Sequence, residues 1–267
     1  MNEMRESMEA EVPQHETPIR IEGESRDGAC VIICEHASNA MPAPWGDLGL
    51  DPEQRKAHIA WDPGALGLAQ ALAVALDAPL AQACQSRLIY DLNRPPQHPG
   101  AMPERSETTD IPGNRDLDGA DRLARVEALY LPFHAEIRAL IARRLARGLS
   151  PILVTVHSFT PIYFGKPRAV ELGVIHDADA RLAEAIVAQA DAQTDLAVQL
   201  NAPYSARDGV THTLALHGTA MGLPNVMLEL RNDLIADSPA QEAMAARLAP
   251  VLRAAMDDTR ATPKETV

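Results

Sequence analysis

Three stretches of the chain share one pattern, a short apolar run that leads directly into charged or imidazole side chains. Short apolar runs of this kind predict buried strands, and the ends of such strands are where α/β proteins place their chemistry. The stretches are residues 31–36 (VIICEH), 152–157 (ILVTVH) and 225–231 (NVMLELR). We therefore expect three strand ends to meet at one site.

The pattern elsewhere predicts helices and further strands that alternate along the chain. Small apolar residues predict a helix at 65–76, and apolar residues at helical spacing predict one long helix at 121–147, kinked at Pro132. Other helices are expected at 51–56, 178–190 and 239–256, and other strands at 79–84, 87–90, 169–175, 196–200 and 211–216. This alternation predicts an α/β fold, a single three-layer α/β/α domain with a mixed, mostly parallel sheet.

Composition divides the chain only near its beginning. Residues 1–27 are polar and acidic, and we expect them to form a mobile tail that docks only near Ile19 and Ile21. Residues 28–260 are expected to form one catalytic domain, because nothing in the composition marks a second boundary. Residues 91–114 are rich in Pro, Gly and charge without periodicity, as is typical of a functional or disordered loop.

Charge and cysteine content narrow the partners and the compartment. The formal net charge is -13 at pH 7, which argues against nucleic acid and anionic membranes as partners. Cys30, Cys34 and Cys84 lack the paired spacing of a zinc ribbon or a disulfide framework, so we expect buried, reduced thiols in a cytoplasmic protein. No apolar run is long enough to span a bilayer, and no signal peptide is recognisable. The sequence indicates no oligomeric state.

Histidines at two of the predicted strand ends suggest a metal site. Catalytic zinc takes three protein ligands, mostly imidazole nitrogens and carboxylate oxygens, and keeps one position open. A single histidine in such a place is more often a hydrogen-bonded core residue, but His36 and His157 at matched positions favour a metal. Asp62 and Glu35 are the candidate carboxylate ligands. Asp62 precedes Pro63 at a helix start, so it fits a helix N-cap equally well.

Glu229, at the end of the third strand, is the candidate catalytic base. Amide hydrolysis requires a group that takes a proton from water and hands it to the leaving nitrogen, and a buried carboxylate near a metal suits that role. The alternative is an ion pair with Arg231, which lies on the same strand face. Cys34 is conceivable as a nucleophile, but its place inside an apolar strand favours packing.

Arginines near strand and loop ends suggest that the substrate carries carboxylates. Guanidinium groups bind carboxylates through two parallel hydrogen bonds. The candidate substrate-binding residues are Arg87, Asn93, Arg94 and Arg231, whereas Arg168 is better explained as a solvated surface residue. The chain has no Walker glycines, no G-x-S-x-G elbow and no G-x-G-x-x-G, so phosphate, serine-hydrolase and dinucleotide chemistry lack support.

Several of these motifs together resemble the N-formylglutamate amidohydrolase family. The motifs are CEHASN at 34–39, HIAWDPGA at 58–65, SRLIYDLNR at 86–94, HSFT at 157–160, NAPY at 201–204 and LELR at 228–231. They occur in the family's order over roughly residues 30–235. The family is similar to zinc-dependent exopeptidases and to zinc amidases that cleave cell-wall peptides. Its named activity is hydrolysis of N-formyl-L-glutamate to formate and glutamate, late in histidine breakdown.

The resemblance implies a set of roles. His36 and His157 would hold Zn²⁺ or another divalent metal, and Glu229 would be the catalytic carboxylate. Asp62 stands where the cell-wall amidases carry their acidic ligand, so it is favoured over Glu35, which remains the reserve ligand. Related peptidases use a His-x-x-Glu pair, but here Asn39 follows His36 at that spacing, and we expect it to orient the substrate.

The expected function is therefore metal-dependent hydrolysis of a small acidic N-acyl amino acid, with N-formyl-L-glutamate as the first candidate. One alternative is a zinc amidase acting on another N-acyl amino acid or a short acidic peptide. Another is a binding module that keeps the fold without the reaction.

Overall fold

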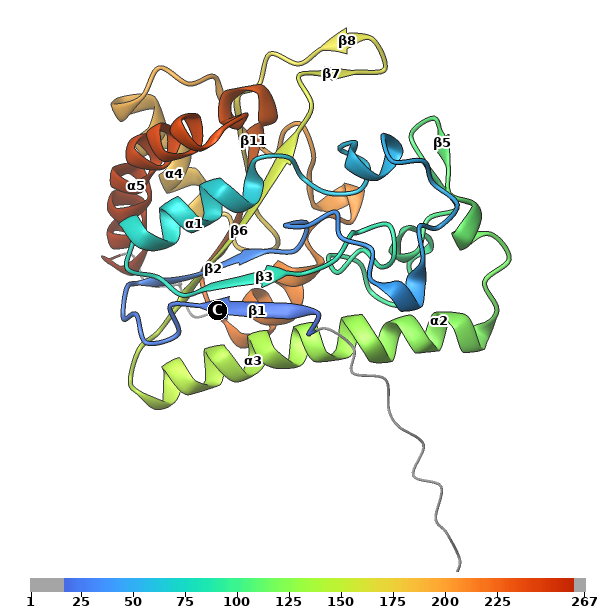
Figure 1. Cartoon of the computed structure of the whole chain (residues 1–267). Coiled ribbons are helices and arrows are strands. Elements are labelled where there is room, and N and C mark those ends of the chain that lie inside the picture. The colour runs from blue at the N-terminus through green and yellow to red at the C-terminus, as the bar shows by residue number, and fades with distance from the viewer. Residues whose placement is uncertain (1–16, 262–267) are drawn as a thin grey trace, which may run out of the picture.

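The computed structural model describes residues 17–261 and is built around one seven-stranded sheet (Figure 1). The strand order is β1-β3-β2-β6-β11-β9-β10. The strands are β1 (Ile19–Glu22), β2 (Cys30–Cys34), β3 (Leu80–Ala83), β6 (Ile152–Phe159), β9 (Leu172–Ile175), β10 (Val198–Leu200) and β11 (Asn225–Arg231). Strands β3, β2, β6 and β11 run parallel, β1 is antiparallel to β3, and β9 is antiparallel to β11. The predicted mixed, mostly parallel sheet is confirmed.

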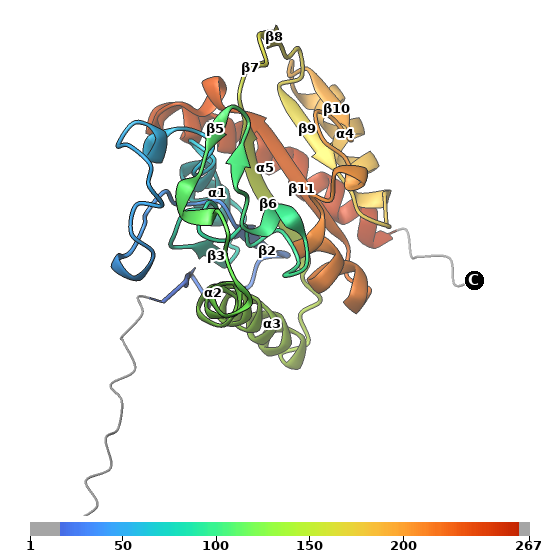
Figure 2. The same ribbon diagram turned by 90° about the vertical axis from the view of Figure 1, so that its right-hand side faces the viewer.

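Helices cover both faces of the sheet, as the alternating pattern predicts. Helices α1 (Ala65–Ala75), α4 (Arg181–Gln193) and α5 (Ser238–Ala261) lie on one face, and the helix that ends in α3 (Leu131–Ala146) lies on the other (Figures 1 and 2). The side chains of successive strand residues therefore point into the hydrophobic clusters on opposite faces of the sheet. Ile32 packs with α1 and α5 residues, whereas Val31 and Ile33 pack in the cluster that contains Ile137 of α3. Because both faces are buried, the central strands read as continuous apolar runs.

The long helix predicted at 121–147 is interrupted near Pro132. It begins as α2 (Gly119–Arg125), where the Asp118 side chain accepts hydrogen bonds from the amides of Ala120 and Asp121. A π-helical turn at Val126–Tyr130 leads into α3. Proline lacks an N–H and crowds the preceding turn, so the wider π turn accommodates it. The expected irregularity thus takes the form of a π turn.

Two predicted strands are wrong. Residues 87–90 form a turn in which Ser86 accepts a hydrogen bond from the amide of Leu88 and donates one to the carbonyl oxygen of Ala60. Residues 211–216 enter a helical segment that includes a π turn at Leu214–Gly218. Short apolar runs do not distinguish a strand from a buried turn or helix, and at 87–90 the hydrogen bonds of Ser86 hold the turn.

The loop expected at 91–114 contains short regular elements, and the helix expected at 51–56 is shorter than expected. The loop folds into short helical turns and a hairpin of β4 (Arg105–Ser106) and β5 (Thr109–Asp110), and the helix shortens to a 3-10 turn at Gln54–Lys56. A second hairpin, β7 (Ile162–Tyr163) and β8 (Lys166–Pro167), follows β6.

The expected tail at 1–27 is described only in part. Residues 1–16 lie outside the described residues, and β1 pairs with β3 along the sheet edge, with Ile19 opposite Ala83. Among the described helices, none combines the length and apolar character that crossing a membrane requires.

Candidate metal centre and active site

The three strand ends singled out in the sequence meet at the carboxyl edge of the sheet. Strands β2, β6 and β11 are neighbours, and His157 of β6 is the register partner of Glu229 of β11. His36 follows β2 by two residues, and its carbonyl oxygen accepts a hydrogen bond from the Asp62 amide at 3.0 Å. That bond brings the loop before α1 to the end of β2. Chemistry-bearing side chains from distant parts of the sequence therefore share one place.

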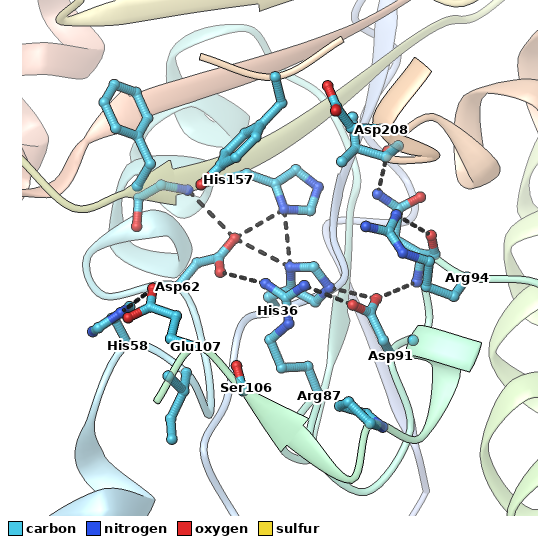
Figure 3. A pocket seen from close by; sticks show the side chains of 18 of the residues that line it. His36, His58, Asp62, Arg87, Asp91, Arg94, Ser106, Glu107, His157 and Asp208 are labelled. Atoms are coloured by element: carbon cyan, nitrogen blue, oxygen red, sulfur yellow. Dashed lines mark hydrogen bonds and ion pairs between the residues drawn. The ribbon is translucent and has the colours of Figure 1, made fainter. Parts of the chain in front are cut away.

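His36, Asp62 and His157 form a tight triangle of ligand-type atoms (Figure 3). The Asp62 Oδ2 atom lies 3.2 Å from His36 Nδ1 and 2.9 Å from His157 Nδ1, and the two Nδ1 atoms are 3.2 Å apart. All three residues are buried. Among the His, Cys, Asp and Glu side chains of residues 17–261, these three form a group close enough together to hold a metal ion.

Each histidine contacts a second carboxylate through its other ring nitrogen. His36 Nε2 lies 2.8 Å from Asp91 Oδ1, and His157 Nε2 lies 3.1 Å from Glu35 Oε2. The Asp91 contact is a hydrogen bond, whereas the Glu35 contact is an ion pair without good hydrogen-bond angles. Carboxylates in this position favour a proton on Nε2 and leave Nδ1 as the metal-binding atom.

The chemistry of the triangle suits a cation. With protons on both Nε2 atoms, the two Nδ1 atoms and Asp62 Oδ2 point lone pairs at one another, and such an arrangement is unfavourable unless positive charge lies between them. The carboxylates around His157 also favour positive charge at this place. Burial opposes a charge on this ring, but Glu35 and Asp62 outweigh it and raise its pKa well above the ordinary value. The residues present therefore fit a divalent metal bound by two imidazoles and one carboxylate.

Arg87 bridges the two aspartates that contact His36. Its Nη1 donates to Asp62 Oδ1 at 3.2 Å, and its Nη2 donates to Asp91 Oδ2 at 2.6 Å. Burial opposes ionisation of Asp91, yet Arg87 and His36 outweigh it and hold its pKa well below the usual range. Arg87 is thus committed to two carboxylates that contact His36.

The alternative role of Asp62 as a helix cap is wrong. Gly64 is the N-cap residue of α1, without a side-chain hydrogen bond, and the Asp62 carboxylate points instead to the two histidines and Arg87. Glu35, the reserve ligand, is fully buried and reaches His157 from the side of Nε2. It therefore lies outside the triangle. Cys34 is buried in the core beside α1, as expected of a packing residue.

Glu229 lines the same pocket, and its Oε2 atom has no hydrogen-bond partner. Burial raises the pKa of Glu229 to about 7, with a further increase from Asp62 and opposing effects from His157 and His36. The ion pair considered between Glu229 and Arg231 is wrong, because Arg231 pairs with Glu171 at 3.3 Å and Asp233 at 2.8 Å. Glu229 is therefore a buried carboxylate that can exchange a proton near neutral pH.

A cavity of about 460 Å³ opens above the triangle. Asn93 and Arg94 line it, and both are tied to the loop at 209–213. Asn93 donates to the Val210 carbonyl oxygen, and Arg94 donates to the carbonyl oxygens of Asn93 and Gly209. In the described part of the chain, no ion pair joins Arg94 to a carboxylate.

Two predicted substrate-binding residues do not reach the cavity. Asn39 donates to the carbonyl oxygen of Arg55, and Arg231 is held by its two acidic partners. Neither lines the pocket. Each side chain is held by acceptors outside the cavity, the Arg55 carbonyl oxygen for Asn39 and two carboxylates for Arg231. Proximity to a site motif in the sequence therefore did not place these side chains in the site.

Asp91 is the residue that the sequence analysis missed. It lies within the SRLIYDLNR motif but was assigned no role, yet it accepts hydrogen bonds from His36, from Arg87 and from the Asn93 amide. Its position between an apolar run and Asn93-Arg94 repeats the pattern of the three strand ends, and that signal could have identified it.

Comparisons with known proteins identify a family and two similar crystal structures. The chain matches the family model described as FGase, N-formylglutamate amidohydrolase, over residues 28–236. The crystal structure of gene product Atu2144 from Agrobacterium tumefaciens has a TM-score of 0.89 and 47% sequence identity, covering 91% of this chain and 96% of that one. The structure of N-formylglutamate amidohydrolase from Ralstonia eutropha JMP134 has a TM-score of 0.66 and 18% identity, covering 92% of this chain and 100% of that one, and shows the shared fold.

Among curated proteins, none matches this chain. The family model covers most of the chain and includes the strand ends, Asp62 and Glu229. The chain belongs to the N-formylglutamate amidohydrolase family.

Proposed function

We propose that this protein is a metal-dependent amidohydrolase that cleaves N-formyl-L-glutamate to formate and glutamate. The observation that carries the proposal is the convergence of His36 Nδ1, His157 Nδ1 and Asp62 Oδ2 beside the buried carboxylate of Glu229. Family membership supports the choice of substrate. A place in histidine degradation in the cytoplasm belongs to the same proposal.

His36, Asp62 and His157 are the residues that would hold the metal. A divalent ion such as Zn²⁺ would supply Lewis acidity there, which lowers the pKa of water and polarises a carbonyl group. Asp91 and Glu35 orient the two imidazoles, and Arg87 keeps Asp62 and Asp91 ionised.

Glu229 acts as the base and then as the acid. Its carboxylate takes a proton from the attacking water, whose oxygen forms a bond to the formyl carbon. The protonated Glu229 then gives this proton to the leaving nitrogen as the C–N bond breaks, so that formate and the free amine result. Burial raises the pKa of Glu229 above its ordinary value, which suits a group that takes a proton and then gives it to the leaving nitrogen.

Arg94 is proposed to bind a carboxylate of the amino acid. Its guanidinium lines the cavity and has no carboxylate partner in the described chain, whereas Arg87 already serves Asp62 and Asp91. Asn93 supports Arg94 by holding the facing loop through the Val210 carbonyl oxygen and the Thr213 amide. The earlier assignment of Arg87 to the substrate is therefore replaced by a role in positioning the acidic residues.

A second candidate is hydrolysis of an N-acyl amino acid that carries only one carboxylate. Among the arginines that line the cavity, Arg87 pairs with Asp62 and Asp91, and Arg105 pairs with Asp110 at 3.5 Å. Within the described residues this leaves Arg94 as the lining arginine without an acidic partner. One such guanidinium matches one carboxylate better than the two of N-formylglutamate.

The test combines metal analysis with a substrate screen. The purified protein is assayed with Zn²⁺ on the N-formyl, N-acetyl and N-succinyl derivatives of glutamate, and on N-formyl derivatives of aspartate, glutamine and leucine. Highest kcat/KM on N-formylglutamate supports the first candidate, and highest kcat/KM on N-formylglutamine or N-formylleucine supports the second. Metal binding without turnover of any compound contradicts both, and failure to bind Zn²⁺ points to a binding module without the reaction.

A further inference from the structure

A tyrosine on the far side of Glu229 from the histidines is placed to take part in the reaction. In the sheet, Glu229 lies between His157 of β6 and Gly173 of β9. The loop that carries Ala202 crosses directly over Gly173, where an added Cβ atom would overlap the Ala202 carbonyl oxygen and lie 3.3 Å from Glu229 Cβ. Tyr204 follows in this loop and lines the cavity.

The packing of Tyr204 confirms that its ring lies on the face of β11 that carries Glu229. The ring packs against a small buried cluster that includes Met227. Met227 and Glu229 are two residues apart on one strand, so their side chains share a face, and both line the cavity. Tyr204 and the metal triangle therefore border the cavity from opposite sides of Glu229.

The hydroxyl of Tyr204 has a proton to donate. Arg168 Nη2 donates to Tyr204 Oη at 3.1 Å, and because a guanidinium has no acceptor, the hydroxyl oxygen is the acceptor in this bond. No acceptor for the Tyr204 proton lies within residues 17–261. Burial raises the pKa of Tyr204, so the hydroxyl stays protonated at neutral pH.

Arg168 is itself held firmly, although its sequence position suggested a solvated surface residue. Its guanidinium carbon lies 4.4 Å from the ring centre of Tyr163 and 5.3 Å from those of Phe159 and Tyr204. Its Nη1 donates to the Thr160 carbonyl oxygen at 3.3 Å. These contacts join the β7–β8 hairpin, which stands above the end of β6 (Figure 1), to the loop that carries Tyr204.

We infer that Tyr204 donates a hydrogen bond to the oxygen of the reacting carbonyl as water adds to it, and that Arg168 positions the Tyr204 hydroxyl for this contact. The inference rests on the proposed function. The oxygen gains negative charge when the C–O bond to water forms, so a donor aimed at it stabilises the transition state more than the substrate. The positive charge of Arg168 beside Oη strengthens Tyr204 as a donor. Tyr204 would thus be a catalytic residue and Arg168 a positioning residue.

The test is Tyr204→Phe, with Tyr163→Phe as the matched variant, which removes the hydroxyl of another ring that lies against the same guanidinium. For Tyr204→Phe we expect kcat to fall by about 100-fold with KM changed by less than about threefold, the effect of losing one oxyanion donor. Metal content and unfolding temperature should match those of the wild type. Arg168→Gln should lower kcat by about 10-fold, and Arg168→Lys should recover part of the loss, because it keeps a charged donor.

A binding measurement separates this inference from the proposed function. A phosphonamidate in which tetrahedral phosphorus replaces the formyl carbon should bind Tyr204→Phe about 100-fold more weakly than the wild type, while glutamate binds both equally. The inference alone is overturned if the wild type turns over substrate and Tyr204→Phe has a normal kcat and a normal affinity for the phosphonamidate. An equal loss of kcat in Tyr163→Phe also overturns it. If the wild type neither turns over an N-acyl amino acid nor binds the phosphonamidate, the proposed function fails and the inference fails with it.

Discussion

Glu229 and His157 are register partners on the neighbouring parallel strands β11 and β6, so their side chains emerge side by side at the cavity. The sheet itself therefore sets the separation between the proposed base and the proposed metal site. Two strand residues in register hold their relative positions more rigidly than two loop residues could. This is the relationship on which the proposed reaction depends.

Replacement of Glu229 by glutamine should remove proton transfer and leave the metal in place. We expect kcat for N-formylglutamate to fall by about 10²- to 10⁴-fold, the range typical of a lost general base. Metal content, measured by elemental analysis, should remain at the wild-type level, because Glu229 lies outside the triangle of His36, Asp62 and His157. A nearly normal kcat would refute the assignment of Glu229 as base.

Asp91 and Glu35 should act on metal affinity through the histidines. Asp91→Asn and Glu35→Gln each remove a carboxylate that contacts a ring nitrogen, and we expect the metal to bind about 10- to 100-fold more weakly. Competition with a chromogenic chelator measures this affinity without any substrate. The matched control is Asp110→Asn, which removes an exposed carboxylate that pairs with Arg105 and Arg115 and not with either histidine. Equal affinities for all these proteins would contradict the positioning roles.

Arg94 and Arg87 should respond differently to loss of charge. Arg94→Gln is expected to raise KM by about 10- to 100-fold with little change in metal affinity, because a charge-assisted bond to a carboxylate contributes about 1.5–3 kcal/mol. Arg87→Gln is expected to weaken metal binding first, because Arg87 pairs with Asp62 and Asp91. Steady-state kinetics and chelator competition on both variants distinguish these outcomes. An equal change in KM for both variants would contradict the separate roles of Arg94 in substrate binding and Arg87 in the metal site.

Two buried histidines behind the site should make stability depend on pH. His134 Nδ1 and His217 Nε2 are 2.9 Å apart, and burial lowers the pKa of His134 to about 3 and that of His217 to about 4. The unfolded chain binds protons at these residues below about pH 6.5, while the folded chain does not. The free energy of unfolding should therefore fall by about 2 kcal/mol per histidine between pH 7 and pH 5.

Urea unfolding of the wild type and of His217→Gln at both pH values measures this effect. The variant should start from a lower stability, because a buried hydrogen bond is lost, yet lose about 2 kcal/mol less than the wild type on acidification. Identical losses in the two proteins would show that His217 is not held neutral in the folded state.

The sequence was most informative where side chains alternate along buried strands. The runs before His36, His157 and Glu229 predicted three neighbouring strands, and the structure places all three residues at one edge. Asp62 was found through its motif, although its sequence position suited a helix cap equally well. The decision came from the contacts of the Asp62 carboxylate with His36, His157 and Arg87, which no periodicity reveals.

The sequence patterns did not predict the contacts that loop residues make. Arg168 was assigned to the surface because solvation is the usual explanation for a single arginine, but the rings of Phe159, Tyr163 and Tyr204 lie against its guanidinium. Arg231 was assigned to the substrate because it lies at a strand end, yet it forms an ion pair with Glu171, the residue before β9. Each arginine has at least one partner that is distant in sequence, Tyr204 for Arg168 and Glu171 for Arg231, and pairing of this kind depends on tertiary packing.

Metal-dependent release of formate from N-formyl-L-glutamate tests the central claim most directly. The protein is stripped of metal by dialysis against a chelator, assayed, and assayed again after stoichiometric Zn²⁺ is restored, alongside His157→Ala treated identically. The account predicts formate release only from the restored wild type, with bound metal near one ion per chain. Equal rates with and without metal, or full activity in His157→Ala, would contradict it.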